Sequence, residues 1–357
     1  MTELALSAAT PSAALEALHH AITTDQVTLP ADGRVLFLRA RDGQWWGGHS
    51  RQKWQCQQSF KPFATVLERS SLLVGEPAPE QRFPLVMVLP PRQRDEARAL
   101  FARAASHVES GGIVIASIAN DEGARSGEAD FRKLFGHAQV LSKHHCRVFW
   151  SQVDNASIEQ PVLAEWQALD APRAIGDGRF VSRPGLFAWN RIDPASALLA
   201  AALPANLRGR VADLGAGYGY LACEVVRRCA GVTAIDLYEA EARAIEPARI
   251  NLAAALEQLD RPIETSIHWH DVATGLPKRY DAIVSNPPFH QGRADQPELG
   301  QTFINAAANA LEPNGSLWLV ANRHLPYEQT FARRFGNVET VILKDGFKVF
   351  KAHGVHA

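Results

Sequence analysis

The segment from Ser285 to His290, Ser-Asn-Pro-Pro-Phe-His, places an amide, two prolines and an aromatic ring next to one another. An exocyclic amine on a nucleobase is a poor nucleophile, because its lone pair is conjugated into the ring. The side-chain oxygen of Asn286 and the main-chain carbonyl of Pro287 can each accept one N–H bond of such an amine, which turns the lone pair toward a methyl donor. The prolines fix the backbone that carries both acceptors. The segment therefore predicts methylation of an exocyclic amine.

Two further side chains of this segment could contact the base that is methylated. Phe289 can stack on an unpaired or flipped-out base, which makes it a candidate catalytic residue together with Asn286 and Pro287. His290 is a candidate substrate contact, although a histidine in a loop is more often a polar spectator. An ordinary proline-rich turn after a strand is the alternative interpretation of the whole segment.

A glycine-rich loop precedes this segment by about 70 residues and predicts the methyl donor. Its cofactor-binding candidates are Asp213, Gly215, Ala216, Gly217 and Gly219, and Asn286 is a further candidate cofactor contact besides its catalytic role. Glycines let the backbone turn sharply and let a ligand approach without interference from Cβ. The dinucleotide fingerprint is G-x-G-x-x-G and binds a pyrophosphate, which would sit poorly beside a carboxylate. A ligand with an ammonium and a sulfonium group is favoured there, and we expect S-adenosylmethionine.

Two more acids follow in the order that this ligand requires. We expect Asp236-Leu237 to end the second strand, where the acid can accept both ribose hydroxyls. Asp271-Val272 is expected to end the third strand and to face the adenine amine. Each acid alone is equally well explained as a strand-end turn or a helix cap, but the ordered series after one glycine loop favours the cofactor site.

These residues need a parallel α/β sheet to bring them together. From Arg208 onward, short apolar runs alternate with helical stretches, a pattern typical of such a sheet. Helices are expected over Glu239–Leu259 and Gln301–Leu311, and Phe347–Lys351 is expected to pair antiparallel with the run before it. The predicted strands before that last one are Arg210–Leu214, Gly231–Asp236, Ile263–His270, Tyr280–Ser285, Gly315–Val320 and Val338–Leu343.

The first half of the chain repeats this pattern without its chemistry. Residues 101–115 and 303–319 show the same succession of helix, stop signal and strand, and such internal repetition indicates a duplicated unit. In this alignment Leu89-Pro-Pro-Arg92 corresponds to Asn286-Pro-Pro-Phe289, so that the amide and the aromatic ring are gone. The first copy is therefore expected to be degenerate, with chance similarity between two α/β domains as the alternative.

The fold prediction follows from this repeat. We expect an α/β protein with two tandem Rossmann-like domains of the class I methyltransferase type, a degenerate one over residues 1–170 and a catalytic one over residues 171–357. A length of 357 residues suits two domains.

Composition restricts the partners. The formal net charge of −1 excludes attraction of a polyanion by the whole-molecule field. RNA would have to meet local groups, and the candidates are Trp45, Arg51, Lys53 and Arg323, although tryptophans packing on a core edge beside solvated cations are equally consistent. No signal peptide, membrane span or metal-ligand cluster is recognised, so a cytoplasmic enzyme without metal is expected, with a monomer favoured.

Four segments together resemble the ribosomal RNA small subunit methyltransferase C family. They are Asp213–Gly219, Ser285–His290, Ala321–Tyr327 and Phe347–Phe350. The resemblance is close over about 170 C-terminal residues and looser over the first half. It implies an S-adenosylmethionine-dependent enzyme that methylates the exocyclic N2 of a guanosine in 16S ribosomal RNA, within the small ribosomal subunit. Guanine as the target comes from the resemblance alone.

Three alternatives stay open at this point. A related family that acts on 23S ribosomal RNA has the same layout. Enzymes that methylate another amine, on DNA or on a glutamine, share the same tetrapeptide. A non-enzymatic RNA-binding assembly factor with a vestigial pocket is the third, and the intact series of acids, glycines and amide argues against it.

Overall fold

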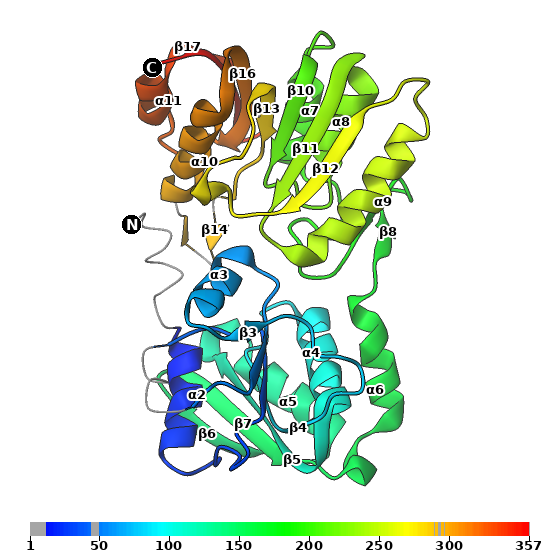
Figure 1. Ribbon diagram of the computed structural model, residues 1–357, viewed down its shortest axis with the longest axis vertical. Coiled ribbons are helices and arrows are strands. Elements are labelled where there is room, and N and C mark those ends of the chain that lie inside the picture. Colours follow the sequence, from blue (N-terminus) through cyan, green and yellow to red (C-terminus); the bar gives the residue numbers. More distant parts are fainter. Residues whose placement is uncertain (1–11, 44–49, 289, 292–293, 296, 357) are drawn as a thin grey trace. The chain divides into compact units, whose positions relative to one another are not determined.

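The computed structural model describes residues 12–43, 50–288, 290–291, 294–295 and 297–356. The chain divides into two compact units, Met1–Ala171 and Pro172–Ala357. Each unit is a twisted sheet with helices on both faces (Figure 1). The units are described separately below.

The N-terminal unit alternates strands and helices along most of its length. Its helices are α2 (Ala13–Thr23), α3 (Lys61–Arg69), α4 (Arg94–His107), α5 (Ala124–Phe135) and α6 (Gln160–Gln167), with 3-10 turns η2 (Asn120–Glu122), η3 (Asn155–Ser157) and η4 (Ala168–Asp170). Its strands are β1 (Val35–Leu38), β2 (Trp54–Gln57), β3 (Leu73–Val74), β4 (Phe83–Val88), β5 (Val108–Ala119), β6 (Gln139–Lys143) and β7 (Cys146–Gln152).

The C-terminal unit has the same succession with short additions. Its helices are α7 (Pro194–Ala202), α8 (Tyr220–Arg228), α9 (Ile245–Leu256), α10 (Pro297–Ala310) and α11 (Glu328–Arg334), with η5 (Ala242–Ala244) and η6 (Val272–Thr274). Its main strands are β10 (Arg208–Leu214), β11 (Gly231–Glu239), β12 (Glu264–Trp269), β13 (Tyr280–Ser285), β16 (Leu311–Asn322), β17 (Phe335–Lys344) and β18 (Phe347–Val355). The short strands β8 (Arg173–Ile175), β9 (Phe180–Ser182), β14 (His290–Gln291) and β15 (Ala294–Asp295) form two separate hairpins.

The two main sheets have one topology. The strand order is β3-β2-β1-β4-β5-β7-β6 in the first unit and β12-β11-β10-β13-β16-β18-β17 in the second. In each sheet all strands run in the same direction except one, β7 in the first unit and β18 in the second, which runs antiparallel to both of its neighbours. The expected pair of tandem Rossmann-like domains is thereby confirmed.

The repeat extends to single residues. The strands β5 and β16 are both 12 residues long and have the same order of buried and exposed positions. A Cβ atom added at Gly112 would lie 3.0 Å from the Pro84 carbonyl oxygen, and one at Gly315 would lie 2.9 Å from the Tyr280 carbonyl oxygen. Each glycine therefore lets its strand approach the neighbouring strand at the same place, which is the position that the sequence alignment pairs.

Each sheet buries an apolar layer on both faces. In the N-terminal unit, α4, α5 and α6 pack on one face and α2 and α3 on the other. In the C-terminal unit, α7, α8 and α9 cover one face through residues such as Leu199, Val225 and Leu252. Strands buried on both faces are typical of parallel sheets.

The structure moves several expected boundaries. The strand expected to end at Asp236 continues as β11 to Glu239, and the helix expected from Glu239 onward begins with the turn η5 and becomes α-helical only at Ile245. The boundary moves because Leu237 and Tyr238 are apolar enough to stay buried and remain paired with β10 and β12. This shift of three residues changes which acid stands at the strand end.

Two further observations concern the described residues. None of their helices has the length and apolar character needed to cross a bilayer. None of their His, Cys, Asp and Glu side chains gather into a group of three or more that could hold a metal ion.

Burial in the N-terminal unit predicts a contrast between two leucines. Leu134 on α5 is fully buried, whereas Leu73 on β3 is 63% exposed. Leu134→Ala should lower the free energy of unfolding by about 2–5 kcal/mol through lost burial and the cavity left behind. Leu73→Ala is the matched control and should stay within about 0.5 kcal/mol of the parent. Urea unfolding followed by circular dichroism measures both, and equal losses would contradict the packing described here.

Candidate active site

The glycine loop follows β10 at the carboxyl edge of the C-terminal sheet. Gly215, Gly217 and Gly219 have φ angles of +69°, +54° and +85°, a region that favours glycine because other residues meet their own Cβ there. The main-chain N–H groups of Gly215 and Ala216 donate to the Tyr238 carbonyl oxygen, at 2.9 and 3.2 Å. The loop is thus closed by the neighbouring strand β11.

The carboxylate of Glu239 lies at the end of β11 and contacts this loop. Its two oxygens accept hydrogen bonds from the N–H groups of Gly217 and Glu241, both at 2.7 Å. Burial raises the pKa of the Glu239 carboxyl above its usual range. A Cβ added at Gly217 would meet no described atom within 4 Å, so there is open space beside the glycine that touches this acid.

Asp213 is buried beneath the loop. One of its carboxylate oxygens accepts from the Ala222 N–H at 3.0 Å, and the other has no hydrogen-bond partner among the residues described. The residue is fully buried, and burial raises the pKa of its carboxyl to about 7, with the nearby charge of Glu239 acting in the same direction. An unpaired buried carboxyl oxygen is costly and marks a place where a cation would be stabilised.

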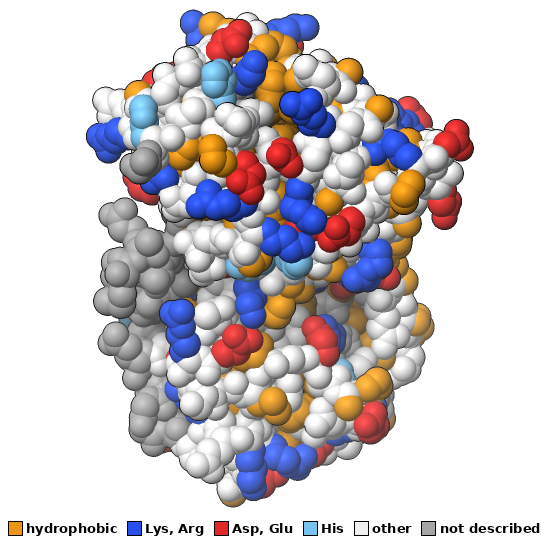
Figure 2. All heavy atoms as spheres, turned by 45° about the horizontal axis from the view of Figure 1, so that its top comes forward, with side chains coloured by type: hydrophobic (Ala, Val, Ile, Leu, Met, Phe, Trp, Pro, Cys, Tyr) orange, Lys and Arg blue, Asp and Glu red, His pale blue; other side chains and the backbone are white. Residues whose placement is uncertain are grey.

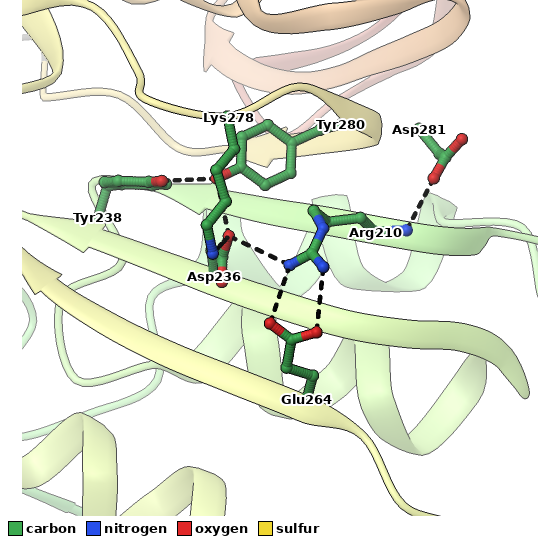
Figure 3. Close-up of polar contacts among 7 residues, drawn as sticks. All are labelled: Arg210, Asp236, Tyr238, Glu264, Lys278, Tyr280 and Asp281. Carbon is green, nitrogen blue, oxygen red and sulfur yellow. Dashed lines mark hydrogen bonds and ion pairs between the residues drawn. The ribbon is translucent and has the colours of Figure 1, made fainter.

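Asp236 is not at the strand end, and the expectation that it accepts the ribose hydroxyls is not supported by its surroundings. It is fully buried in β11, three residues before the end of that strand. The Tyr280 hydroxyl and the Lys278 ammonium group donate to one of its oxygens, at 2.9 and 3.0 Å. Figure 3 shows these groups converging on the carboxylate, together with Arg210 at 3.7 Å. These contacts tie β10, β11 and β13 together through one oxygen of Asp236, while its other oxygen is buried without a partner among the described residues. The ion pair and the hydrogen bonds between strands indicate a structural role for Asp236.

The expectation that Leu237 contacts the cofactor is not supported by its surroundings either. It is fully buried in the apolar layer beneath α8 and α9, because successive side chains of a strand point to opposite faces. Asp271 follows β12 as expected, with a side-chain oxygen that accepts from the Ala273 N–H at 2.9 Å. Val272 is buried at the start of η6. The His270 N–H donates to the Glu239 carbonyl oxygen at 2.8 Å, which brings these two strand ends side by side.

Asn286 directly follows β13, as the sequence predicts. Its amide nitrogen donates to a carboxylate oxygen of Asp193 at 3.0 Å and to the Ser196 hydroxyl at 2.8 Å. Its carbonyl oxygen is buried and has no hydrogen-bond partner within the described ranges. The Ser285 hydroxyl donates to the Leu214 carbonyl oxygen at 2.8 Å, so the ends of β13 and β10 lie together. The structure therefore offers a free oxygen acceptor next to the glycine loop.

The structure describes only some of the other residues expected to contact the substrate. Pro287 is buried and Pro288 is exposed. Phe289 lies outside the described residues, and of His290 only the backbone in β14 is described. Arg323 is exposed just after β16, and its main-chain N–H donates to the Gly346 carbonyl oxygen at 2.8 Å.

The segment before α7 is attached to the glycine loop. The side chain of Asn251 on α9 exchanges two hydrogen bonds with the backbone of Val181 and donates a third to the Tyr218 carbonyl oxygen. The Tyr218 hydroxyl donates to the Arg191 carbonyl oxygen at 3.2 Å. These contacts hold the stretch that leads to Asp193 against the loop, and its Phe187 side chain is 60% exposed.

The N-terminal unit keeps this geometry but has different side chains. The strand registers pair Leu38 with Val88 and Leu214 with Ser285, so Arg39 stands where Gly215 stands and also has a positive φ, of 51°. Its guanidinium group donates to the Leu89 carbonyl oxygen at 3.2 Å and thus spans the ends of β1 and β4. An arginine side chain crosses the edge where the C-terminal unit has open space.

The acids are replaced as well. By the same registers, Phe37 corresponds to Asp213 and Gln58 corresponds to Glu239. Gln58 still accepts from the backbone two residues later, at 2.9 Å, as Glu239 does. The backbone hydrogen bonding is retained while the carboxylates are absent.

The residues expected to contact RNA in this unit differ in their surroundings. Trp45 lies outside the described residues. Arg51 pairs with Asp42 at 2.7 Å and is only 17% exposed, while Lys53 is exposed. Trp54 is buried in the core. On the face of the molecule in Figure 2, basic and acidic side chains are interspersed, in agreement with the net charge of −1.

The C-terminal site fits S-adenosylmethionine on structural grounds. The buried unpaired oxygen of Asp213 suits the positive end of such a ligand, and open space at Gly217 lets it approach the backbone. Glu239 and Asp271 at adjoining strand ends suit ribose hydroxyls and an adenine amine. Ligands bind at this edge of open α/β sheets.

Sequence reasoning missed three residues of this site. Glu239 was assigned to a helix, because apolar runs do not mark strand ends to within three residues. Asn251 and Asp193 gave no signal beyond ordinary helix and capping positions. The apolar residues Leu237 and Tyr238, which continue the buried run of β11, are the one clue in the sequence that could have moved the strand end to Glu239.

Comparisons with known proteins agree with this geometry. Residues 177–351 match the family described as the methyltransferase small domain. The ribosomal RNA small subunit methyltransferase C of Pseudomonas aeruginosa is 30% identical over 325 residues, which cover 91% of this chain and 92% of the relative. Its counterpart in Pseudomonas paraeruginosa is 31% identical over the same shares of both chains.

A solved structure is similar across both units. It is the N2-guanosine 16S rRNA methyltransferase of T. thermophilus in complex with AdoMet and guanosine, with a TM-score of 0.75 and 26% identity, covering 92% of this chain and 90% of that chain. Fold, strand-end residues and relatives agree, and this chain belongs to the ribosomal RNA small subunit methyltransferase C family.

Proposed function

We propose that this chain transfers a methyl group from S-adenosylmethionine to the exocyclic N2 of a guanosine in 16S ribosomal RNA. The observation that carries the proposal is the unpaired carbonyl oxygen of Asn286 beside the glycine loop. The relatives that match over nine-tenths of the chain are named ribosomal RNA small subunit methyltransferases, and the similar solved structure is named a 16S rRNA N2 methyltransferase. No observation favours a DNA, protein or large-subunit RNA substrate.

Residues at the end of β13 make the guanine amine more nucleophilic. When bound, S-adenosylmethionine supplies an electrophilic methyl group on its sulfonium. The Asn286 side-chain oxygen and the Pro287 carbonyl oxygen accept the two N–H bonds of the guanine amine and direct its lone pair away from the ring. Phe289 stacks on the extruded base and His290 contacts it. No general base is needed beforehand, because the proton leaves after the nitrogen has become cationic.

The carboxyl ends of β10, β11 and β12 would hold the cofactor. The glycine loop of Gly215, Ala216, Gly217 and Gly219, with Asp213 beneath it, would bind the methionine part. Glu239 would accept the ribose hydroxyls in place of Asp236, and Asp271 with Val272 would bind the adenine. Accepting both hydroxyls requires a carboxylate at the strand end, and Glu239 is the acid at that position.

The N-terminal unit, residues 1–170, is assigned no catalysis. Arg39, Gln58 and Leu89 replace the groups that a cofactor and an amine would need. We assign to this unit a role in holding RNA or supporting the fold, with Lys53 and Trp45 as RNA contacts and Arg51 as a weaker candidate because it is paired. Arg323 is the corresponding contact of the C-terminal unit, residues 171–357. The reaction takes place in the cytoplasm on the small ribosomal subunit, with the enzyme as a monomer.

The first test removes the acceptor. Asn286→Ala should lower kcat by about 100-fold or more, the range found when one preorganised transition-state hydrogen bond is lost. The dissociation constant for S-adenosylmethionine should change by less than about 3-fold, since the cofactor is held by other strand ends. Labelled methyl transfer to isolated small subunits and calorimetry measure the two quantities.

Asn337→Ala is its control, because Asn337 is exposed on the edge strand β17. Large subunits are the substrate control, and digestion of the product identifies the methylated position. An Asn286→Ala enzyme with full activity, or a product other than N2-methylguanosine, would falsify the proposal.

The second test compares the two acids of β11. Glu239→Gln should weaken S-adenosylmethionine binding by about 10- to 100-fold, because the amide replaces one of the two acceptor oxygens with an NH2 donor. Asp236→Asn should leave that affinity within about 3-fold, but lower the free energy of unfolding by about 1–3 kcal/mol through loss of its charge beside Lys278. Calorimetry and urea unfolding of both variants separate the roles. The reverse outcome would restore Asp236 as the ribose ligand.

The third test concerns the pH dependence that Asp213 causes. Its folded pKa of about 7 lies above the usual 3.8. At pH values between these two pKa values, the Asp213 carboxyl has lost its proton in the unfolded chain but keeps it in the folded chain. The free energy of unfolding of the ligand-free protein therefore falls as pH rises through this range. Asp213→Asn should gain stability relative to the parent by about 3 kcal/mol more at pH 8 than at pH 5. Urea unfolding at both pH values measures this.

Binding of a cation should draw the same proton off Asp213. Calorimetry of S-adenosylmethionine binding at pH 7, in buffers of different ionisation enthalpy, should show net proton release by the parent and none by Asp213→Asn. A pH-independent difference in stability between the two proteins would show that Asp213 is ionised throughout.

A further inference from the structure

The amide of Asn286 can face the target amine in two ways. In one, its carbonyl oxygen accepts an N–H bond of the substrate. After a half-turn of the amide, its NH2 group would face the substrate NH2 group, and two donors would meet. Only the first orientation prepares the nucleophile, so whatever fixes the amide also determines the rate.

Asp193 fixes that orientation. The Asn286 amide nitrogen lies 3.0 Å from the Asp193 Oδ2 and 2.8 Å from the Ser196 Oγ. An ionised carboxylate accepts hydrogen bonds and donates none, so it must face the NH2 group of the amide. The carbonyl oxygen then points the other way, where it is buried without a partner among the described residues.

The first turn of α7 places both acceptors. Asp193 caps this helix, and the same Oδ2 accepts from the Ser196 N–H at 2.8 Å. Pro194 occupies the first helical position, and Ala195 and Leu199 are buried against the sheet. A capped and packed helix start has little freedom, so the two acceptors stay aimed at the end of β13.

We propose that Asp193 and Ser196 are positioning residues for methyl transfer, which hold the Asn286 amide with its carbonyl oxygen toward the target amine. The inference rests on the proposed function and assigns a role to the end of the segment that precedes α7. A cap alone would explain the Ser196 N–H contact, but it would not require the contacts to the amide that lies 90 residues or more along the chain.

Ser196→Ala is the sharpest single change, because it removes one acceptor and leaves the backbone cap intact. The parent side chain is buried and alanine is the better helix former, so the melting temperature should not fall. The kcat should drop by about 3- to 10-fold, the range for one neutral hydrogen bond, with the KM for S-adenosylmethionine unchanged. Ser196→Thr keeps the hydroxyl and should recover most of the rate.

Asp193→Ser separates capping from positioning. Serine caps helices about as well as aspartate, but its side chain is shorter and does not reach the amide. The kcat should fall by about 10- to 100-fold while the melting temperature changes little. Ser106→Ala, the same kind of change within α4 of the N-terminal unit, is the control and should leave kcat unchanged.

A swapped pair tests the direction of the hydrogen bond. Asn286→Asp alone places two carboxylates face to face, and their repulsion should disrupt the site. Combining it with Asp193→Asn reverses donor and acceptor, so that the introduced amide donates to the introduced carboxylate and a free oxygen again faces the substrate. We expect the double variant to be at least 10-fold faster than Asn286→Asp.

The outcomes separate this inference from the proposed function. If Asn286→Ala abolishes transfer but Ser196→Ala and Asp193→Ser keep the parental kcat, the amide is catalytic and its positioning by α7 is wrong. The same conclusion follows if the double variant is no faster than Asn286→Asp. Full activity of Asn286→Ala would overturn both. A parallel fall of kcat and melting temperature in Ser196→Ala, without recovery in Ser196→Thr, would reduce Ser196 to a structural residue.

Discussion

Acidic side chains orient the polar groups at the carboxyl edge of the C-terminal sheet. Asp193 faces the NH2 group of Asn286 and leaves its carbonyl oxygen free. Glu239 draws the Gly217 N–H toward β11 and closes the glycine loop. Asp213 accepts from the start of α8 and keeps one oxygen unpaired. Each acid is satisfied on one side by the protein, and under the proposed function the remaining acceptor capacity faces the ligand, which is the form of preorganisation that catalysis requires.

The duplicated topology shows how little has to change for one unit to differ from the other in chemistry. Both sheets have the same strand order, and the loops after the equivalent strands β1 and β10 each start with a residue of positive φ. In the N-terminal unit that residue is Arg39, and its side chain crosses the sheet edge to the Leu89 carbonyl oxygen. The framework survives because backbone hydrogen bonds and the buried apolar layers maintain it. Binding and catalysis depend on a few side chains at one edge, and these are the ones replaced.

Much of the fold and part of the site could be predicted from the sequence. Apolar runs with helical stretches between them indicate a parallel sheet. The glycine loop and the Asn-Pro-Pro segment, each directly after a predicted strand, indicate a cofactor site and a site that binds an amine. The sequence does not single out Glu239 as the acid at the strand end, because Asp236 and Glu239 are chemically equivalent side chains and only strand pairing and contacts with distant residues distinguish them. Asp236 is held by Tyr280 and Lys278, which lie more than 40 residues away. No local pattern reports such a contact.

The sequence by itself determined the class of reaction, since Asn286 and Pro287 provide two acceptors on a stiff backbone and Asp213 precedes a loop of alternating glycines. It also determined the duplication, because helix, stop signal and strand recur in the same order. Only the tertiary structure decided which acid stands at the strand end and which way the Asn286 amide points. The physical reason is that both depend on contacts between distant segments, β11 with β13 and α7 with β13. Strand pairing and helix packing create these contacts, whereas local sequence determines only the elements that make them.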